Sequence, residues 1–328
     1  MMEVVFLGTS SAVPSKYRNH ASIAIKGFGE IFLFDCGEGT QRQMAIAKVS
    51  PMKVKRIFIS HLHGDHILGI PGLIQSMGFR NRKKPLTIYG PPGIKEVKEA
   101  MMKLGEFSID FDINVKEIKN EGIVFENEKY KIECIKTKHT TENYSYSIEE
   151  KKRPRFLREK AIKLGVKPGP AFSKLHRGIP VKVGDRIVKP EEVLGKPRKG
   201  IKVVYSGDTV PHEKMIEFAK DADLLIHDST FEAGKENKAL ETGHSTAKDA
   251  AKIAKEANVK YLVLTHLSTR YREAKKIEND AKKIFKKSIV AEDLMSITIV
   301  RKEIREIKRR ILEINEETIP RSELKFND

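Results

Sequence analysis

The sequence predicts an α/β protein with a four-layer αββα architecture, in which two β-sheets lie face to face and helices cover their outer surfaces. Three observations support this. The 328 residues contain two β-rich halves, and each half has helical segments beside its strands. The strands and helices do not alternate in a regular βαβ rhythm, and no G-x-G-x-x-G turn follows a strand, which argues against a doubly wound dinucleotide-binding fold.

The first half contains short runs of β-type residues separated by turns that carry glycine. These runs predict strands over residues 3–7, 21–26, 30–34, 56–60 and 86–89. Apolar residues at helical spacing predict helices over 40–49, 67–77 and from Pro91 through Leu104. Alternating or β-branched residues then predict an antiparallel meander of three strands, over 111–118, 129–137 and 144–148.

The second half returns to strands and helices after a basic, proline-bearing segment. Strands are expected over 202–206, 224–227, 261–265 and 295–301, and helices over 215–219, from Thr246, and over 273–287. The helix at Thr246 has a capping-box start, with Asp249 three residues later. Its amino end therefore lies beside His244.

Composition limits the class of protein. Apolar residues make up 39% and charged residues 33% of the chain, as in a globular protein. No stretch approaches the roughly 18 apolar residues of a membrane span, and the amino terminus lacks signal-peptide features. We therefore expect a cytoplasmic protein without a membrane partner. The two cysteines, Cys36 and Cys134, are too few for a disulfide framework or a cysteine zinc knuckle, so any metal must be held by histidines and carboxylates.

The charge is strongly basic and concentrated in one segment. The chain has 62 Lys and Arg against 45 Asp and Glu, a net charge of +17, which is typical of a protein that binds a polyanion. Between Lys151 and Lys199 there are 16 basic residues and four acids, a net charge of +12. Prolines interrupt this segment, and its apolar residues show no regular helical or strand spacing. Residues 151–199 are therefore predicted to form an inserted arm, the alternative being a solvated charge run.

The strongest chemical signal is His61-Leu62-His63-Gly64-Asp65-His66, which follows the predicted strand 56–60. Four ligand-type side chains within six residues, at a turn from strand to helix, can point at one metal ion. Two ions would need further ligands from elsewhere. Candidates that follow other predicted strands are His139, Asp208 and His266. Each of these taken alone could equally be an ordinary structural residue.

The H-x-H-x-D-H motif with the later His, Asp and His resembles the metallo-β-lactamase superfamily, over about residues 3 to 300. This resemblance implies the αββα fold and two metal ions, zinc with Mn or Fe as alternatives. The implied ligands of the first ion are His61, His63, His139 and Asp208. The implied ligands of the second ion are Asp65, His66, His266 and the bridging Asp208. Such a pair activates water, whose pKa falls to about 7 on zinc, and Asp65 would also orient that nucleophile.

Five further segments resemble the tRNase Z family, the endonucleases that trim precursor tRNA at its 3′ end. They include the loop Pro14-Ser15-Lys16-Tyr17-Arg18-Asn19 and the run Asp35-Cys36-Gly37-Glu38-Gly39-Thr40-Gln41. The others are His227-Asp228-Ser229-Thr230-Phe231, His244-Ser245-Thr246, and Thr265-His266-Leu267-Ser268 followed by Arg270-Tyr271. Judged singly, Gly37 and Gly39 could merely form a turn from a strand to a helix, and Arg18 and Arg270 could be solvated charges.

The resemblance also implies roles for residues outside the metal ligands. A histidine oriented by a carboxylate suits protonation of a departing ribose oxygen, and His244 with Asp228 fits this role. Many family members have Glu where this chain has Asp228, and the shorter side chain could fail to reach His244. His244 could instead cap the following helix. Arg270 would hold a substrate phosphate, and Lys16 and Arg18 would contact tRNA.

Gly169-Pro170 within the basic segment resembles the tRNA-clasping flexible arm of the family. The expected organisation is a metallo-β-lactamase domain over 1–305, interrupted by the arm at 151–199, and a charged tail over 306–328. The family implies a homodimer in which one subunit's arm serves the other's active site.

These features predict a zinc-dependent endoribonuclease acting on precursor tRNA. It would cut after the discriminator base and leave a 3′-hydroxyl on the tRNA and a 5′-phosphate on the trailer. One alternative is another two-metal phosphodiesterase or hydrolase of the superfamily with a small substrate, against which the basic arm argues. The other is an RNA-binding module with a decayed site, against which the complete ligand set argues.

Overall fold

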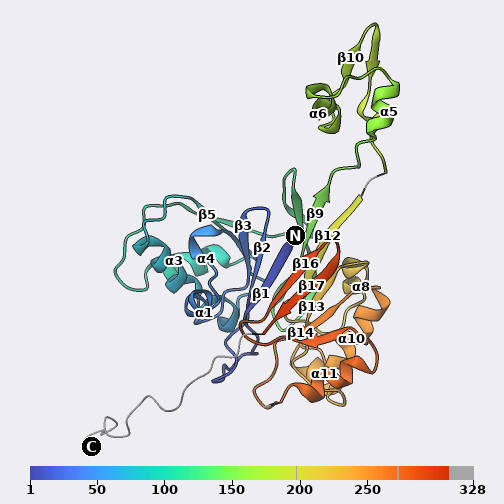
Figure 1. Cartoon of the computed structure of the whole chain (residues 1–328). Helices are drawn as coiled ribbons and strands as arrows, with labels where there is room; N and C mark the ends of the chain where they lie inside the picture. Colours follow the sequence, from blue (N-terminus) through green and yellow to red (C-terminus); the bar gives the residue numbers. More distant parts are fainter. Residues whose placement is uncertain (197, 272, 310–328) are drawn as a thin grey trace, which may run out of the picture.

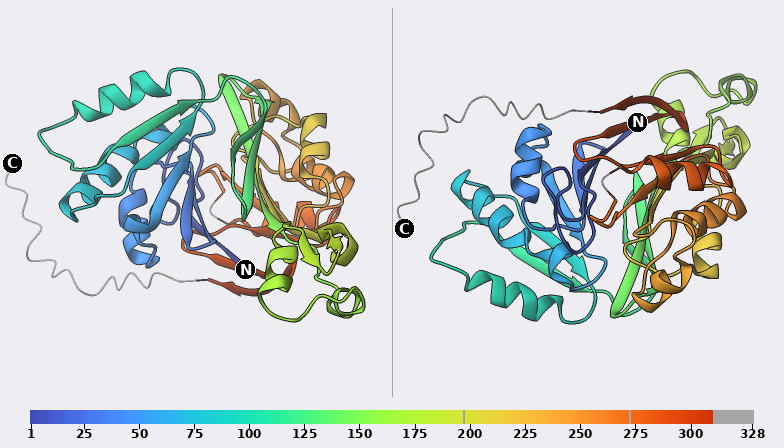
Figure 2. Two further views of the ribbon diagram at one scale, coloured as in Figure 1. Left: turned by 90° about the horizontal axis from the view of Figure 1, so that it is seen from above. Right: turned by 90° about the horizontal axis from the view of Figure 1, so that it is seen from below.

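The structure, a computed structural model, describes residues 1–196, 198–271 and 273–309. Within these residues an eight-stranded sheet faces a seven-stranded sheet, and helices cover the outer surface of each (Figures 1 and 2). Both sheets mix parallel and antiparallel pairs. The two sheets with their outer helices form the predicted αββα architecture, which is the metallo-β-lactamase fold.

The first sheet has the strand order β17-β16-β1-β2-β3-β4-β5-β6. Its strands are β1 Met2–Gly8, β2 Ser22–Gly27, β3 Glu30–Phe34, β4 Val54–Phe58, β5 Leu86–Gly90, β6 Ile113–Glu117, β16 Ser296–Val300 and β17 Glu303–Lys308. The second sheet has the order β15-β14-β13-β12-β9-β8-β7. Its strands are β7 Gly122–Glu126, β8 Tyr130–Lys138, β9 Glu142–Lys152, β12 Arg198–Tyr205, β13 Leu224–Asp228, β14 Leu262–Thr265 and β15 Ser288–Val290.

Three apolar clusters hold the layers together. The cluster between the sheets is rich in aromatic residues, among them Phe34, Phe58 and Tyr146, which lie within 6 Å of one another by ring centroid. A second cluster joins the first sheet to α1 Thr40–Ile46, α3 Ile70–Phe79 and α4 Ile94–Met102. A third joins the second sheet to α8 Glu213–Ala219, α10 Ala247–Glu256 and α11 Lys275–Lys282. Cys36 and Cys134 are buried free thiols, as expected of small core residues.

The predicted strands are present, but one pairing differs. The meander predicted from 111–118 onwards is wrong in its first strand, because β6 pairs in parallel with β5 in the first sheet. The meander consists instead of β7, β8 and β9. The short elements α2 Gly64–Ile67, α9 Glu236–Glu241, β7, β15 and β17 were not predicted separately. Such short segments carry too few residues for a clear period. Strand β17 runs past residue 305, and residues 310–328 of the predicted tail lie outside the described residues.

A projecting arm leaves the second sheet where β9 and β12 extend beyond their neighbours (Figure 1). Lys152 and Arg198 are register partners at its base. The sequence shows no apolar period here, yet the arm contains α5 Arg158–Lys163, α6 Pro170–His176, the hairpin of β10 Val181–Val183 and β11 Arg186–Val188, and α7 Pro190–Val193. These enclose a small core of their own, made of Ala161, Val166, Leu175, Val188 and Val193.

No helix in the described ranges is both long enough and apolar enough to cross a bilayer.

The separate core of the arm generates a prediction. Leu175→Ala removes a fully buried side chain from the arm core, and such a change costs about 2–5 kcal/mol in a packed core. Amide hydrogen exchange should therefore accelerate within residues 155–195 and stay unchanged in the two sheets. The matched control is Leu240→Ala, a leucine that is 55% exposed on the body. Faster exchange throughout both sheets would contradict an independently packed arm.

Candidate metal centre and catalytic dyad

Three histidines from two loops form the first half of the site. The imidazole Nε2 of His61 lies 2.9 Å from Nδ1 of His63, and Nε2 of His139 lies 3.2 Å from that same atom. His61 and His63 follow strand β4, and His139 follows strand β8 of the other sheet. The structure thus brings a candidate ligand from the second sheet beside the six-residue motif of the first.

The second half of the site centres on Asp208, which follows strand β12. Its Oδ2 lies 3.3 Å from Nε2 of His66 and 3.2 Å from Nε2 of His266. The Oδ2 of Asp65 lies 3.3 Å and 3.5 Å from these two nitrogens. Asp208 also approaches the first group, at 3.7 Å from Nε2 of His61. A carboxylate that adjoins both groups is placed where a bridging ligand would lie.

In three of the cluster histidines, the imidazole nitrogen that faces away from the cluster is held by a hydrogen bond. Nδ1 of His61 meets Ser60 Oγ at 2.9 Å, Nδ1 of His139 meets the Gly243 carbonyl at 2.8 Å, and Nδ1 of His266 meets Thr230 Oγ1 at 2.9 Å. Such outer contacts fix the ring orientation and the tautomer of a metal-binding histidine. The donor atoms that point inward are therefore preorganised.

Asp35 lies in one of the family motifs, but no role was predicted for it. Its completely buried carboxylate accepts four hydrogen bonds. The donors are the Ser60 N–H at 2.7 Å, Ser60 Oγ at 2.8 Å, His66 Nδ1 at 2.8 Å and the Tyr205 hydroxyl at 2.6 Å. An aspartate directly after a buried strand was the only available signal. Its partners become visible only when the sheets face each other.

Burial and charge set the protonation of the cluster. Burial lowers the pKa of His61 well below its usual value, and the neighbouring charge of His66 adds to this effect. Burial alone would raise the pKa of Asp208, but the charges of His266 and His66 outweigh it and hold that pKa well below its usual value. Burial opposes the charged form of His66, but the charges of Asp208 and Asp35 raise its pKa well above its usual value. Neutral imidazole and ionised carboxylate are the forms that bind a cation, so a cation bound here would replace the proton of His66.

Two buried polar atoms without a hydrogen-bond partner indicate that the side chains of the cluster fit a bound cation. Within the described chain, His66 Nε2 and Asp208 Oδ1 have no hydrogen-bond partner although both are shielded from solvent. Unsatisfied buried polar atoms are costly, and a cation would satisfy both. Histidine nitrogens and carboxylate oxygens are the donors that zinc prefers. The groups His61, His63, His139 and Asp65, His66, Asp208, His266 each bring their ligand atoms within 4.8 Å of one another.

A histidine and a carboxylate form a dyad beside the cluster. Nδ1 of His244 lies 2.9 Å from Oδ2 of Asp228. The aspartate side chain therefore reaches His244, although it is shorter than the glutamate of many family members. Asp228 also accepts from the Thr209 N–H and from the N–H and hydroxyl of Thr230, which fixes its carboxylate. The cap of α10 is Thr246, with the predicted capping box to Asp249, so His244 is not the cap. Burial opposes the charged form of His244, but Asp228 raises its pKa to about 9.

The residues expected to contact substrate lie on loops and at the start of an arm helix. Arg270 is exposed, donates to Ser268 Oγ at 3.0 Å and lies 5.1 Å from the centroid of the Phe231 ring. Lys16 is on an exposed loop, whereas the Arg18 guanidinium is turned inward and donates to Thr9 Oγ1 at 2.6 Å. Gly169 and Pro170 start helix α6 in the projecting arm.

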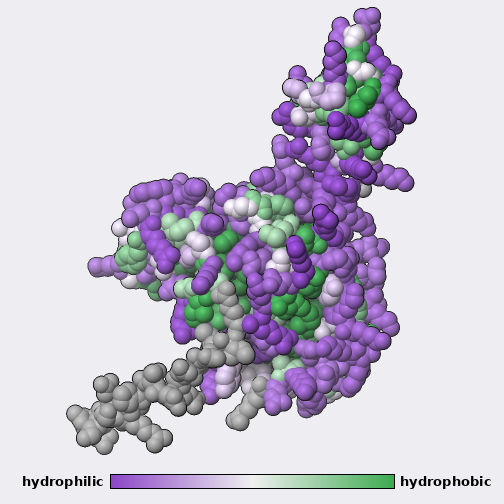
Figure 3. Space-filling model, viewed as in Figure 1, coloured by the Kyte–Doolittle hydropathy of each residue, from purple (hydrophilic) through white to green (hydrophobic). Residues whose placement is uncertain are grey.

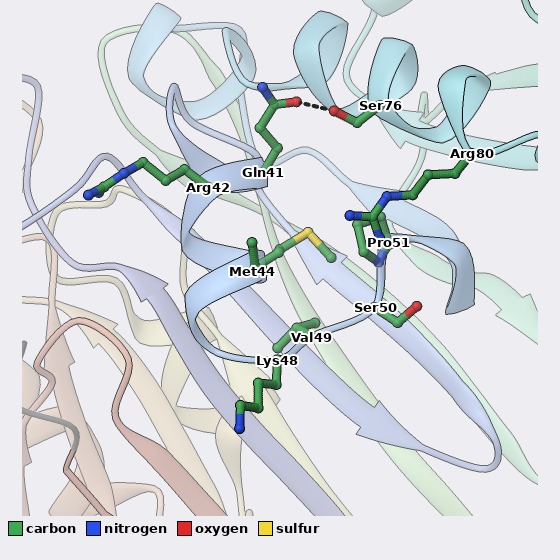
Figure 4. Close-up of a pocket in the computed structure, with 10 residues that line it drawn as sticks. Gln41, Arg42, Met44, Lys48, Val49, Ser50, Pro51, Ser76 and Arg80 are labelled. Atoms are coloured by element: carbon green, nitrogen blue, oxygen red, sulfur yellow. Dashed lines mark hydrogen bonds between the residues drawn. The ribbon is translucent and has the colours of Figure 1, made fainter.

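A cavity of about 560 Å³ lies between α1 and α3, away from this cluster (Figure 4). Its lining contains Gln41, which accepts a hydrogen bond from Ser76, and the basic residues Arg42, Lys48 and Arg80. No histidine or carboxylate lines it among the described residues. The charged ends of Arg42 and Lys48 point away from that of Arg80 in Figure 4, so this cavity does not present a convergent ligand set.

Comparison with known proteins places these features in a family. A sequence profile described as "Anti-Pycsar protein Apyc1" matches residues 2–154, and one described as "Beta-lactamase superfamily domain" matches residues 180–267. The chain is 65% identical over 299 residues to Ribonuclease Z of Methanothermobacter thermautotrophicus, covering 91% of this chain and 97% of that protein. The chain belongs to the ribonuclease Z family.

Other ribonuclease Z relatives agree. Ribonuclease Z of Methanocaldococcus jannaschii is 50% identical over 313 residues, covering 91% of this chain and 98% of its own length. The crystal structure of the short form of human tRNase Z superposes with a TM-score of 0.67 and 28% identity, covering 91% of this chain and 99% of that one. The family resemblance seen in the motifs of the sequence is therefore confirmed over the length of the fold.

The Asp35 contacts generate a prediction for this ribonuclease Z family member. Asp35→Asn keeps the shape of the side chain but places an N–H₂ group against donors such as the Tyr205 hydroxyl. Loss of such an outer contact typically weakens metal binding by about 10- to 100-fold. The measurement is zinc affinity by chelator competition, with circular dichroism to verify folding. The control is Asp110→Asn, an exposed surface aspartate paired with Lys83. Unchanged zinc affinity in Asp35→Asn would contradict this role.

Proposed function

We propose that this protein is a zinc-dependent endoribonuclease that removes the 3′ trailer from precursor tRNA. The cut falls after the discriminator base and leaves a 3′-hydroxyl on the tRNA and a 5′-phosphate on the trailer. The observation that carries the proposal is the 2.9 Å contact of His244 with Asp228 beside the histidine and carboxylate cluster. Membership in the ribonuclease Z family supports the same substrate.

Two zinc ions per subunit are the proposed cofactors, although Mn and Fe suit the same ligands. His61, His63 and His139 would hold the first ion, Asp65, His66 and His266 the second, and Asp208 would bridge them. Such a pair supplies a hydroxide nucleophile at neutral pH and neutralises the charge of the phosphate under attack. The unpartnered atoms His66 Nε2 and Asp208 Oδ1 support this assignment.

Three further roles in RNA cleavage fall to side chains of the site: orienting the nucleophile, protonating the leaving group and binding a phosphate. Asp65, 3.3 Å from His66 at the edge of the cluster, orients the nucleophile. When the phosphorus–oxygen bond breaks, the ribose 3′-oxygen leaves with negative charge and needs a proton. His244 donates that proton from Nε2, because Asp228 holds Nδ1 and so fixes the tautomer. Arg270, exposed beside Phe231, binds a neighbouring phosphate.

The projecting arm supports a macromolecular substrate. The metal cluster lies where β8 ends and β9 begins, whereas the arm leaves from the other end of β9. The eleven residues of β9 span about 30 Å at the rise of a β-strand, and hydrophilic residues cover most of the arm's visible face (Figure 3). An arm this far from the metal cluster of the same subunit could bind the tRNA elbow through Gly169-Pro170. It could also bind a tRNA that is cut in the partner subunit's site. We therefore also propose a homodimer.

The direct test uses purified protein and end-labelled precursor tRNA with a 3′ trailer. A cut after the discriminator base that leaves a 3′-hydroxyl and is lost with chelator is the expected result. Asp65→Ala should abolish cleavage while tRNA binding persists, because Asp65 is placed at the chemistry and not in the arm. The control is Asp110→Ala, a surface aspartate. Intact RNA together with hydrolysis of a small phosphodiester would instead favour another phosphodiesterase of the superfamily.

The leaving-group role of His244 can be tested by changing the leaving group. His244→Ala should slow precursor tRNA cleavage by about 10²- to 10⁴-fold, the usual range for a lost general acid. Hydrolysis of bis(p-nitrophenyl) phosphate should change far less, because p-nitrophenolate leaves without a proton. Steady-state rates on both substrates are the measurement. Equal losses on both would assign His244 to metal binding or structure.

The recognition role of the arm can be tested without disturbing the sheet. Lys152 and Arg198 are opposite each other, so an Asn-Gly turn can join them in place of residues 153–197. This variant should bind and cut precursor tRNA weakly and hydrolyse bis(p-nitrophenyl) phosphate like the intact protein. Binding should also lose much of its salt dependence, because fewer phosphates are contacted. Unchanged tRNA affinity would remove the arm from recognition.

A further inference from the structure

The loop of residues 11–19, here called the rim loop, borders the metal cluster. At its start, the Ser11 N–H donates to the Leu267 carbonyl at 3.1 Å, one residue after the candidate ligand His266. At its end, the Asn19 side chain donates to the Glu38 carbonyl at 2.7 Å. The adjacent Gly37 is so close to the backbone of Asp65 that a Cβ atom there would lie 2.3 Å from its carbonyl oxygen. The rim loop is thus anchored beside two of the candidate ligands.

The carboxylate of Asp293, in the connection between β15 and β16, joins the end of the rim loop to Thr9 and to helix α1. Its Oδ2 accepts from the Asn19 N–H at 2.7 Å and its Oδ1 accepts from Thr9 Oγ1 at 2.7 Å. Gln43 of helix α1 donates its Nε2 to the same Oδ2 at 2.9 Å. Three segments that are distant in sequence therefore meet at this one residue. None of these contacts belongs to the metal cluster or to the His244 dyad.

The arginine of the rim loop is linked to this carboxylate through Thr9. Arg18 donates Nη1 to Thr9 Oγ1 at 2.6 Å and to the Ala291 carbonyl at 2.7 Å, and the Thr9 hydroxyl in turn donates to Asp293 Oδ1 at 2.7 Å. The neighbouring Tyr17 is 69% exposed. Arg18 is therefore directed into the protein, while Tyr17 is presented on the outer surface of the loop.

We propose that Asp293 is a positioning residue for RNA cleavage, which holds the rim loop in place so that its outer surface orients the nucleotides on either side of the cut. This inference rests on the proposed endoribonuclease function. Arg18 then belongs to the clamp and does not contact RNA directly. Asp293 touches neither substrate nor metal and acts only through the loop. A small phosphodiester has no flanking nucleotides, so its hydrolysis does not depend on this clamp.

The experiment compares Asp293→Asn with the intact protein on precursor tRNA and on bis(p-nitrophenyl) phosphate, with zinc content measured for each. The amide presents N–H groups to the Asn19 and Gln43 donors and loosens the loop. Since small displacements near reacting groups can cost about 10²-fold, kcat/KM for precursor tRNA should fall by about 10- to 100-fold. Zinc content and hydrolysis of the small phosphodiester should be unchanged. If Asp293→Asn folds poorly, Thr9→Val is the second variant, because it removes the hydroxyl shared by Arg18 and Asp293. It should likewise lower kcat/KM for precursor tRNA and leave zinc content and hydrolysis of the small phosphodiester unchanged.

The matched control is Glu292→Gln, which removes the same charge from the adjacent residue. Glu292 pairs with Arg309 at 3.2 Å. Its charge also acts on Arg18, but no hydrogen bond of its side chain to Thr9, Arg18 or Asn19 is found in the described chain, so this control separates loss of charge from loss of the hydrogen bonds. This variant should cut precursor tRNA normally. Equal rates for Asp293→Asn and Glu292→Gln would overturn the proposal, as would parallel losses of RNA cleavage, small-substrate hydrolysis and zinc.

A double-mutant cycle with Arg18→Met separates the clamp from direct RNA contact. Two residues of one network should show strongly non-additive effects, so the double variant should cut precursor tRNA no more slowly than the worse single variant. Additive losses would make Arg18 an RNA contact and contradict the clamp. Intact protein that fails to cut precursor tRNA would contradict the proposed function. Intact protein that cuts, alongside an Asp293→Asn variant that cuts equally well, would contradict this inference alone.

Discussion

The buried carboxylate of Asp35 is the interaction on which the geometry of the site depends. It lies at the end of a strand of the first sheet, yet one of its four donors, the Tyr205 hydroxyl, comes from the second sheet. Through Ser60 and His66 it also fixes the backbone and one ring of the six-residue motif. A carboxylate without solvent must have its acceptor sites filled. The same residue therefore joins the two sheets and orients a candidate metal ligand.

The chemistry is placed where the strands end. Asp208, Asp228 and His266 come at or directly after neighbouring parallel strands of the second sheet, and these strands end at the same edge of the sheet. The motif from His61 to His66 reaches this edge from the opposite sheet. Because both sheets are packed together through aromatic residues, candidate ligands from distant parts of the sequence are held with their donor atoms within 4.8 Å of one another in each group.

The proposed chemistry and the proposed RNA recognition are separated in space. The dense cluster of histidines and carboxylates lies at one end of the second sheet, while most of the net positive charge lies on the arm at the other end. Its own apolar core lets the arm keep a defined shape away from the body. Positive charge along a projecting element suits a long polyanion such as tRNA, which is bound mainly through its phosphates. Between the two, the rim loop is held by Asp293 at the edge of the cluster.

The sequence alone determined the fold class, the positions of most strands and, through the family resemblance of its H-x-H-x-D-H motif, the seven residues proposed as metal ligands. The strands could be located because they depend on local apolar patterns, whereas His139, Asp208 and His266 were ambiguous without the resemblance. Only the tertiary structure decided that β6 joins the first sheet, that the arm has its own core, that Asp228 reaches His244, and that Thr9 links Arg18 to Asp293. Each of these depends on contacts between residues far apart in the chain, and a local pattern carries no information about which distant partner a side chain meets.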